Sequence, residues 1–291
     1  MRILVTGATG RLGNYLMARL ALGAHDVVGW GRGGPRLAVS GQLQTVDLTD
    51  AVGVARAIQA ADPEVVIHLA AISSADEVRR APRTAWEINV EATRRLVKWA
   101  IDNDRRLVFT STDLVFDGTR SWYREGDPPR PILEYGRMKR TAELAVGESS
   151  LNLTVRVSLL YGNAPWGRES FFDRAVSSML AGVPSAFFDD EYRTPLDYAT
   201  AAGVLVKLAE SKASGLIHLG GPERLSRFQL MRRAAVALGI DPDRVLPTSL
   251  LRQPMAEPRP ADVSLDTTRL RNQFPDLTIP PIETALGSLG R

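Results

Sequence analysis

Short apolar runs alternate with amphipathic stretches along the first half of the chain. Runs of strand length occupy residues 2–6, 26–30, 43–46, 64–69, 105–111 and 153–157. The stretches between them, such as residues 51–60, space apolar residues three and four apart, as one face of a helix requires. This alternation predicts a parallel sheet with helices on both of its faces. The expected fold class is therefore α/β, a doubly wound Rossmann-type sheet.

A long helix is expected from Pro82, because proline is well tolerated in the first turn of a helix. Apolar residues then recur at helical spacing, namely Ala85, Ile88, Ala92, Leu96 and Trp99 or Ala100. The regular alternation ends near residue 158, where Pro, Gly and aromatic residues become more frequent. We therefore divide the chain into a dinucleotide-binding domain, residues 1–158, and a small irregular lobe, residues 159–291, that binds mostly the substrate. A helix near residues 196–211 is expected to return to the first domain.

Composition narrows the functional classes. The chain has 291 residues, 44% of them hydrophobic and 24% charged, which is close to globular averages and excludes a disordered or fibrous protein. Cysteine is absent, which excludes disulfides and thiolate metal sites. The N-terminus shows no signal-peptide pattern and no apolar run spans a bilayer, so we expect a soluble, cytoplasmic protein with no membrane partner. The net charge is +3, and the Lys and Arg residues are scattered, which disfavours nucleic acid and favours a small anionic ligand.

A glycine-rich segment follows the first predicted strand directly. Residues 6–13 read TGATGRLG, with Gly7, Gly10 and Gly13 at the start of the next predicted helix. Glycines allow a close approach to the backbone, and the helix N-terminus attracts anions, so this arrangement suits a dinucleotide pyrophosphate. The alternative is a glycine-rich turn that binds no ligand.

The end of the second strand indicates which dinucleotide is preferred. NAD-binding sites usually offer an acidic residue to the ribose there, whereas this chain has Gly31 and Arg32. An arginine suits a 2′-phosphate, so we predict NADPH as the cofactor, with NADH as the alternative. Arg32 could also be an ordinary solvated loop residue. Asp47 follows the third strand, where it could accept a hydrogen bond from the adenine amino group.

A polar strand end and a helical pair together suggest chemistry on a carbonyl or alcohol. The strand that ends at FTSTDLVFDG stops on Ser111, Thr112 and Asp113, and EYGRMKR follows with Tyr135 and Lys139 four residues apart. A helix places such a pair on one face. A nearby ammonium is expected to lower the pKa of tyrosine from its usual value of about 10. Thr112 could then bind the substrate oxygen while Tyr135 exchanges its proton.

Through these motifs the chain resembles an extended short-chain dehydrogenase/reductase. Further segments match in order: VIHLAA, INVEAT, VRVSLLYG, GLIHLGG and PRPADVSLDTTRL. STDLVFDG with YGRMK most resembles the dTDP-4-dehydrorhamnose reductases and the related regulatory β subunits of methionine adenosyltransferase. The resemblance implies that Thr112, Tyr135 and Lys139 are catalytic and that Asp113 assists them. The residues expected to bind the cofactor are Thr6, Gly7, Gly10, Arg11, Leu12, Gly13, Arg32, Asp47, Leu48, Ala70, Asn89, Tyr135 and Lys139.

The implied function is NADPH-dependent reduction of the 4-keto group of a nucleotide-activated deoxysugar. Two alternatives share the fold: a non-catalytic regulatory subunit that binds a dinucleotide and a partner enzyme, and a sugar-nucleotide epimerase or dehydratase that recycles its cofactor. The expected partner is a small nucleotide-sugar, and a homodimer is allowed for. Leu114, Leu159 and Leu160 stand where the reductases usually carry aromatic residues, so the identity of the sugar stays open.

Other polar residues indicate a function less specifically. His68 and His218 lie in apolar strands and, like His25, are better interpreted as structural than as metal ligands, so we expect no metal. The acidic run from Asp189 to Glu191 reads as a solvated turn, with a divalent-ion or dimer contact as the alternative. Arg156 would pair with a local carboxylate. Arg168, Arg193 and Arg259 could clamp a nucleotide diphosphate, although each taken singly is better interpreted as a surface arginine. The glycosylation pattern at Asn152 is discounted.

Overall fold

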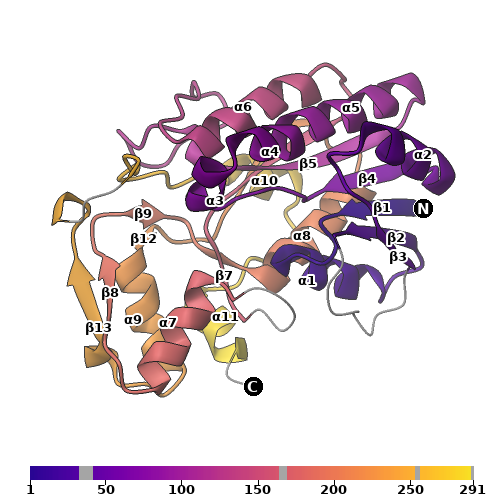
Figure 1. Cartoon of the computed structure of the whole chain (residues 1–291). Helices are drawn as coiled ribbons and strands as arrows, with labels where there is room; N and C mark the ends of the chain where they lie inside the picture. The colour runs from indigo at the N-terminus through magenta and orange to yellow at the C-terminus, as the bar shows by residue number, and fades with distance from the viewer. Residues whose placement is uncertain (33–41, 164–168, 253–255, 290–291) are drawn as a thin grey trace.

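The computed structural model describes residues 1–32, 42–163, 169–252 and 256–289. Its main body is a parallel sheet covered by helices, and a smaller lobe lies beside one end of the sheet (Figure 1). Within the described residues the large sheet has seven strands in the order β11-β6-β5-β4-β1-β2-β3, all of them parallel. The strands are β1 Arg2–Thr6, β2 Asp26–Gly31, β3 Gln42–Thr45, β4 Val65–His68, β5 Arg106–Thr112, β6 Leu153–Val157 and β11 Gly215–Leu219. The α/β doubly wound prediction is confirmed.

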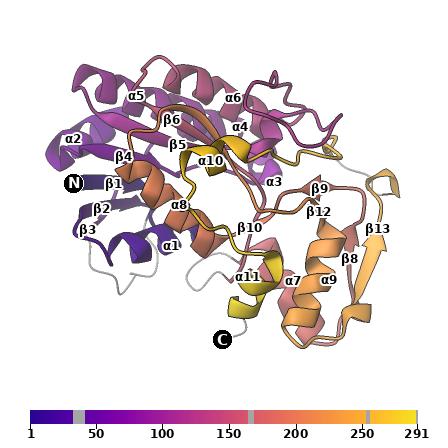
Figure 2. The ribbon, with the colours of Figure 1, turned by 180° about the vertical axis from the view of Figure 1, so that it is seen from behind.

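Two layers of helices bury the two faces of the sheet. One layer contains α1 Arg11–Leu20, α8 Tyr198–Glu210 and α10 Thr268–Gln273 (Figure 2). The other contains α2 Ala51–Ala61, α3 Ala75–Arg80, α4 Pro82–Trp86, α5 Ala92–Asp102 and α6 Glu134–Val146. Leu16, Met17 and Leu20 of α1 lie in one fully buried cluster with Leu205 and Leu208 of α8. Residues beyond 158 thus contribute both α8 and β11 to the sheet body.

The helix expected from Pro82 begins there but is interrupted. A π-helical turn, Glu87–Glu91, separates α4 from α5. Such turns widen a helix locally and are frequent at functional sites. Ala85, Ile88, Ala92, Leu96 and Ala100 are all buried, as the apolar spacing predicts, whereas Trp99 is only partly buried. Asn89, in the middle of this segment, is buried as well.

The lobe has its own apolar core and three short strand pairs. Its helices are α7 Phe171–Leu180, α9 Arg227–Ala237 and α11 Ile282–Leu289, with 3-10 turns at Pro242–Arg244 and Leu250–Arg252. β13 Val245–Thr248 pairs with β8 Ser185–Phe188, β12 Leu225–Ser226 with β9 Tyr192–Arg193, and β10 Leu196–Asp197 with β7 Leu160–Tyr161. Ser170 with Asp173 and Ser226 with Gln229 form capping boxes that start α7 and α9.

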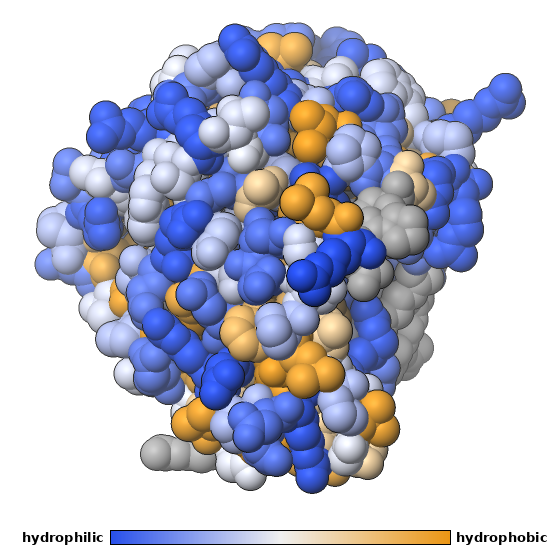
Figure 3. All heavy atoms as spheres, turned by 90° about the vertical axis from the view of Figure 1, so that its left-hand side faces the viewer, coloured by the Kyte–Doolittle hydropathy of each residue, from blue (hydrophilic) through white to orange (hydrophobic). Residues whose placement is uncertain are grey.

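The surface on the lobe side is mostly hydrophilic, with separate apolar patches between charged side chains (Figure 3). The large apolar residues exposed on the lobe are Leu180, Val183, Val236, Leu246 and Leu251. In the described part of the chain, no helix combines the length and the apolar character needed to cross a bilayer. The expected homodimer stays a prediction.

Candidate active site

The glycine loop after β1 has no room for side chains. Gly7 has a φ of +71°, and a Cβ atom on it would lie 2.8 Å from the nitrogen of Ala70. A Cβ atom on Gly13 would lie 2.1 Å from the Gly7 carbonyl oxygen. The N-terminus of α1 begins at Arg11 after Gly10, and no side chain caps it. The loop therefore presents bare backbone and uncapped N–H groups, as a bound pyrophosphate requires.

Thr6 supports this loop from below. Its hydroxyl is 2.6 Å from Nδ1 of His68 and accepts from the Ala70 N–H at 3.3 Å. His68 is also 3.0 Å from the Thr93 hydroxyl, and burial, with a smaller effect of Lys139, lowers its pKa to about 3. The interpretation of His68 as a buried structural histidine is confirmed. Leu12, also predicted at the cofactor, packs partly buried against the core.

The end of β2 places Arg32 and Asp47 on one exposed edge. A Cβ atom on Gly31 would lie 2.6 Å from the Thr9 hydroxyl, so β2 approaches the glycine loop closely. Asp47 accepts from Thr49, and these bonds, with a smaller contribution from Arg32, hold the pKa of Asp47 below its usual value. Leu48 is buried, and its carbonyl accepts from Arg95 at 3.2 Å.

Asn89 fixes the loop after β4. Its Oδ1 accepts from the Ile72 N–H at 2.8 Å, and its Nδ2 donates to the Ile72 carbonyl at 2.9 Å. Nδ2 also lies 3.8 Å from the sulfur of Met138 on α6. Asn89 is buried, on the same side of the helical segment as Ala85 and Ala92. Asn89 therefore positions the segment that contains Ala70 rather than standing free at the surface.

Three consecutive polar residues at the end of β5 have different partners. Ser111 donates to Glu143 of α6 at 2.6 Å. The Thr112 hydroxyl accepts from the Leu114 N–H at 3.2 Å and donates to Asp113 at 3.2 Å, so it begins the 3-10 turn Asp113–Val115. All three polar residues are buried. The strand therefore ends in a turn that the Thr112 hydroxyl closes, while the Ser111 hydroxyl bonds the neighbouring helix α6.

Close backbone packing brings Tyr135 and Lys139 of α6 to this turn. A Cβ atom on Gly136 would lie 2.2 Å from the Leu114 carbonyl oxygen, so the helix backbone lies directly against the 3-10 turn. Tyr135 and Lys139 are buried, and Nζ of Lys139 is 4.0 Å from the centre of the Phe109 ring. The structure thus brings together the strand end and the helical pair that the sequence marked as one site.

The pKa shifts at this pair differ from the sequence-based expectation. Burial raises the pKa of Tyr135, and the charge of Asp113 raises it further. Burial lowers the pKa of Lys139 to about 7, against a smaller opposing effect of Glu143. The expected lowering of the tyrosine pKa by a nearby ammonium is therefore wrong for this arrangement, because desolvation dominates both groups. Tyr135 is a protonated phenol, which can donate a proton.

Behind the pair lies a buried ion pair, whose carboxylate, Glu143, was not identified from the sequence. Arg156 of β6 donates to both oxygens of Glu143 at 2.8 Å, and Arg140 donates to one of them at 3.0 Å. Although burial alone would raise it, Arg156 keeps the pKa of Glu143 below its usual value. The expected carboxylate partner of Arg156 is confirmed. Tyr135, Lys139 and Glu143 follow one another at intervals of four residues, and this spacing is the signal that could have identified Glu143.

Asp113 is not free, because it pairs with an arginine of the lobe. Its Oδ1 accepts from Nη1 of Arg193 at 2.7 Å, and its Oδ2 accepts from Ser158 at 3.0 Å. Arg193 is buried and also lies 3.5 Å from Glu191. Arg193 is therefore not the surface arginine that the sequence favoured, and its guanidinium faces two carboxylates rather than a place for a diphosphate.

The acidic run contains a buried carboxylate rather than a fully solvated turn. Glu191 accepts from Arg227 at 2.5 Å and from Arg259 at 3.2 Å. Although burial alone would raise it, Arg227, Arg193 and Arg259 hold the pKa of Glu191 below its usual value. Asp190 accepts from Ser249 and Leu250. Among the described residues no three His, Cys, Asp or Glu side chains form a metal-binding group.

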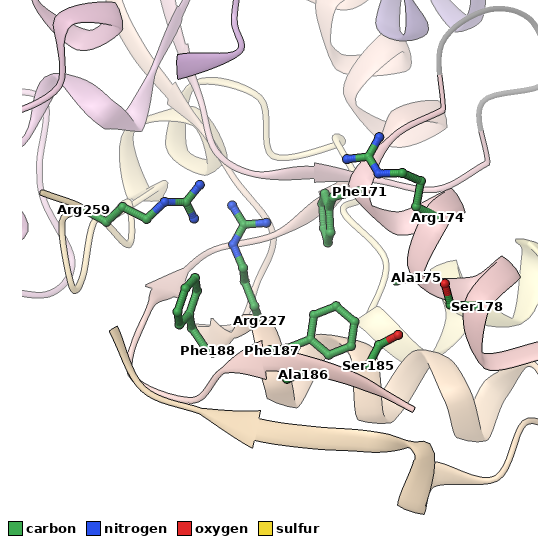
Figure 4. Close-up of a pocket in the computed structure, with 10 residues that line it drawn as sticks. All are labelled: Phe171, Arg174, Ala175, Ser178, Ser185, Ala186, Phe187, Phe188, Arg227 and Arg259. Carbon is green, nitrogen blue, oxygen red and sulfur yellow. The ribbon is translucent and has the colours of Figure 1, made fainter. Parts of the chain in front are cut away.

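Arg227 and Arg259 also line a cavity of about 310 Å³ in the lobe (Figure 4). Phenylalanine rings and guanidinium groups project toward the same space (Figure 4). The lining residues are Phe171, Arg174, Ala175, Ser178, Ser185, Ala186, Phe187, Phe188, Arg227 and Arg259. The sequence reading named only Arg259 of this set, and Arg168 lies outside the described residues. Aromatic surfaces beside cations suit a flat base joined to phosphate groups.

Two remaining expectations, the structural role of the other histidines and the absence of glycosylation at Asn152, concern residues away from the cavity. His218 is buried, 3.4 Å from Arg156, and its Nδ1 lies 3.1 Å from the Tyr123 carbonyl; burial lowers its pKa to about 4. Asn152 is buried and bonds the Leu107 N–H and the Val146 carbonyl, which agrees with discounting it as a glycosylation acceptor. His25, in contrast, lies 2.9 Å from Glu210 at the surface.

Comparison with known proteins gives relatives that match this architecture. Bovine methionine adenosyltransferase 2 subunit beta is 32% identical over 283 residues, covering 92% of this chain and 81% of that protein. Agl14 of Haloferax volcanii, a probable low-salt glycan biosynthesis reductase, is 29% identical over 295 residues, covering 99% and 97% of the two chains.

Solved structures match over nearly the whole chain. A hypothetical dTDP-4-dehydrorhamnose reductase from Sulfolobus tokodaii has a TM-score of 0.85 and 30% identity, covering 97% of this chain and 98% of the other. The dTDP-4-dehydrorhamnose reductase from Bacillus anthracis, in complex with NADP, has a TM-score of 0.88 and 26% identity, covering 99% and 98%. The sequence model of one family, described as the RmlD substrate binding domain, matches residues 1–289. This chain therefore belongs to the RmlD substrate binding domain family.

Proposed function

We propose that this protein reduces the 4-keto group of a nucleotide-activated deoxysugar with NADPH. The observation that carries the proposal is the contact between Gly136 and the Leu114 carbonyl, because it seats Tyr135 beside the turn formed by Thr112 and Asp113. A proton donor and a hydroxyl that can bind a carbonyl oxygen are then adjacent, as ketone reduction requires. The similar reductase from Bacillus anthracis, with NADP bound, supports the cofactor.

The chain's own residues fit the dinucleotide. The crowded Gly7 and Gly13 and the uncapped start of α1 would hold the pyrophosphate. Arg32 would bind the 2′-phosphate, and Asp47 and Leu48 lie on the same edge for the adenosine. Bound there, the nicotinamide supplies a hydride.

The proton would come from Tyr135. Its raised pKa keeps the phenol protonated at neutral pH, so it can donate to the oxygen that becomes an alcohol. Thr112 would donate a hydrogen bond to the same oxygen. Lys139, with a pKa of about 7, would in its protonated form stabilise the phenolate that remains when Tyr135 gives up its proton, and it would also contact the cofactor ribose.

The lobe cavity would bind the nucleotide of the substrate. Arg174, Arg227 and Arg259 bring positive charge to the cavity for a diphosphate, and the single carboxylate of Glu191, which bonds Arg227 and Arg259, balances only part of it. Phe171, Phe187 and Phe188 offer surface for a base. Sugar-binding aromatics are replaced by Leu114, Leu159 and Leu160, all of them partly buried. The identity of the base and of the sugar is left open by this proposal.

The test is oxidation of NADPH, followed by its absorbance, against a panel of nucleotide 4-keto sugars that includes dTDP-4-dehydrorhamnose. We expect turnover with at least one member, with weaker activity on the dTDP-rhamnose precursor than typical reductases show. The matched control is the same assay with Tyr135→Phe, which should bind NADPH and oxidise it at least about a hundredfold more slowly. If the protein binds NADPH but oxidises it with no keto sugar of the panel, the proposal is rejected.

A regulatory subunit is the second candidate. The 32% identity to bovine methionine adenosyltransferase 2 subunit beta favours it, since that protein is named as a subunit. Under this function the protein would bind NADPH, reduce no keto sugar, and form a stoichiometric complex with a partner enzyme. Affinity purification of the tagged chain from its own cells, with measurement of the subunit ratio, separates the two functions.

A further inference from the structure

One oxygen atom at the end of β5 receives two hydrogen bonds. Oδ1 of Asp113 accepts from Nη1 of Arg193 at 2.7 Å and from the Thr112 hydroxyl at 3.2 Å. The arginine bond is short and charge-assisted, whereas the threonine bond is long for two oxygens. The oxygen accepts both bonds at once, but the charge of Arg193 weakens it as an acceptor for Thr112, and in this sense the two donors compete.

Arg193 reaches this oxygen from the lobe. It ends β9, which pairs with β12 through Leu225, and only about 5% of its surface is exposed. Its Nη2 lies 3.5 Å from Glu191, and its Nε has no hydrogen-bond partner among the described residues. Arg193 therefore contacts the site through the hydrogen bond from Nη1 to Asp113, and Glu191 lies on the other side of the guanidinium.

The number of protons on Thr112 gives this competition a consequence. A threonine hydroxyl carries one proton, so it can donate either to Asp113 or to a carbonyl oxygen, but not fully to both. A carboxylate without a cationic partner is a strong hydrogen-bond acceptor, so the Thr112 hydroxyl would donate to it. A carboxylate already engaged by a guanidinium attracts it less.

We infer that Arg193 is a positioning residue for the reduction: by engaging Oδ1 of Asp113, it weakens the hydrogen bond from Thr112 to Asp113, so that this hydroxyl can turn and donate to the substrate oxygen. The inference rests on the proposed function, in which Thr112 binds that oxygen. It gives Arg193 a role other than the diphosphate clamp considered from the sequence. It also makes the lobe, through β9, part of what orients the site on β5.

The first test is steady-state kinetics of Arg193→Gln at about pH 8, where a carboxylate is ionised. We expect kcat to fall about tenfold or more, because a hydrogen bond to the reacting oxygen is lost. The Kd for NADPH should stay within about twofold of wild type, since Arg193 does not contact the glycine loop. A purely structural defect would instead lower the fraction of NADPH-binding protein.

The double variant Asp113→Asn with Arg193→Gln tests the cause of the loss. A neutral amide attracts the Thr112 proton less than a carboxylate does, so kcat should recover at least about fivefold relative to Arg193→Gln alone. The double variant also removes the unpaired buried charge that could prevent the single variant from folding. The matched control is Arg224→Gln, which breaks an arginine–aspartate pair of 2.6 Å with Asp262 in the same lobe and should leave kcat unchanged.

A second test does not depend on turnover. Thr112→Val is introduced into wild type and into the Arg193→Gln variant, and the folding equilibrium constant is measured by urea unfolding. If the two donors compete, Thr112 bonds Asp113 more strongly when Arg193 is absent, so Thr112→Val should reduce that constant about tenfold more in the variant background. Equal reductions in the two backgrounds would overturn the inference.

The outcomes separate this inference from the proposed function. Turnover by wild type with no loss of kcat in Arg193→Gln, or with no recovery in the double variant, overturns the inference and leaves the reductase intact. No turnover by wild type, together with unequal effects of Thr112→Val, rejects the reductase but supports competition for Asp113.

Discussion

At the carboxyl end of β5 nearly every polar side chain is buried and bonded to another strand or helix, whereas the lobe cavity is lined by long arginine and phenylalanine side chains. Gly136 lies against the Leu114 carbonyl and Ser111 bonds Glu143, so backbone and buried charge both fix the first region. In the cavity Arg174 is exposed, and Phe171, Phe187 and Arg227 are half-buried.

This difference indicates that the two regions have different roles: the end of β5 sets the reaction, and the lobe cavity sets which substrate is bound. A site built from close backbone contacts tolerates few alternatives, because any added atom must displace the main chain. A cavity lined by side chains can change its shape and charge by substitution without disturbing the sheet. We therefore expect the chemistry to follow the family and the nucleotide-sugar to depend on this chain. The predictions below test that division.

The largest effect should come from the proton donor. Tyr135→Phe removes one oxygen atom from a buried ring, so we expect kcat to fall by about two to four orders of magnitude while the Kd for NADPH changes little. Stopped-flow or absorbance assays with the best substrate of the panel measure kcat. Tyr15→Phe, which loses a single bond from Tyr15 to the Asn163 carbonyl, is the control and should keep full activity. Near-normal kcat in Tyr135→Phe would remove the proposed mechanism.

Next comes the buried ion pair behind the site. Glu143→Ala leaves Arg156 buried without its bidentate partner, which should lower the free energy of unfolding by about 3–5 kcal/mol. Urea unfolding followed by circular dichroism measures this change. Glu134→Ala, on the same helix but in an exposed pair with Arg137, should cost less than about 1 kcal/mol. Equal losses in the two variants would show that the strand end is not the more tightly built region.

The fold and the reactive pair could be predicted from sequence because they depend on local patterns. Apolar runs locate the strands, and the four-residue interval places Tyr135 and Lys139 together. The partners of Arg193 and Glu191 could not be predicted, because they come from segments far apart in the chain, such as β5 and α9. The tyrosine pKa was predicted in the wrong direction, since burial is a tertiary property. The inward position of Asn89 agrees with the helical spacing of Ala85 and Ala92, whereas the π-helical turn around it does not show in that spacing.

Lys139 should make the stability of the protein depend on pH. Burial lowers its pKa to about 7 in the folded chain, against an ordinary value of 10.5 in the unfolded chain. Between these values the unfolded state binds more protons, so the free energy of unfolding rises with pH, by at most about 1.4 kcal/mol per pH unit. Below about pH 7 both states carry the proton, and the folded state bears the full cost of the buried charge.

The measurement for Lys139 is the difference between wild type and Lys139→Met in urea unfolding, at intervals from about pH 7 to 10. Subtraction removes the titration of groups that the two proteins share. The excess slope of wild type should vanish in the variant. An identical slope in both would mean that Lys139 is solvated, contrary to the tight packing described for this region.

Arg32 tests the cofactor edge, which is more exposed than the β5 end. A charge-assisted contact with a 2′-phosphate contributes about 1.5–3 kcal/mol, so NADPH should bind roughly tenfold or more tightly than NADH. Arg32→Ala should remove most of that preference and leave NADH binding unchanged. Titration of intrinsic fluorescence with each cofactor measures both dissociation constants. Equal affinities in wild type would contradict the assignment of NADPH.

The smallest effect is expected where the two regions meet, at Leu114. Its carbonyl belongs to the tightly packed turn, but its side chain is half-buried and replaces an aromatic residue that the reductases usually carry. Leu114→Tyr should leave kcat nearly unchanged, because Tyr135 and Thr112 keep their backbone positions. It should increase kcat/KM for dTDP-4-dehydrorhamnose about fivefold, since one added aromatic or polar contact contributes about 1 kcal/mol. Leu144→Tyr on the exposed face of α6 is the matched control, with no expected effect on either constant. A change in kcat as large as that in KM would show that the side chain at position 114 acts on the reaction itself. The division between a fixed reaction and a variable substrate preference would then fail at this residue.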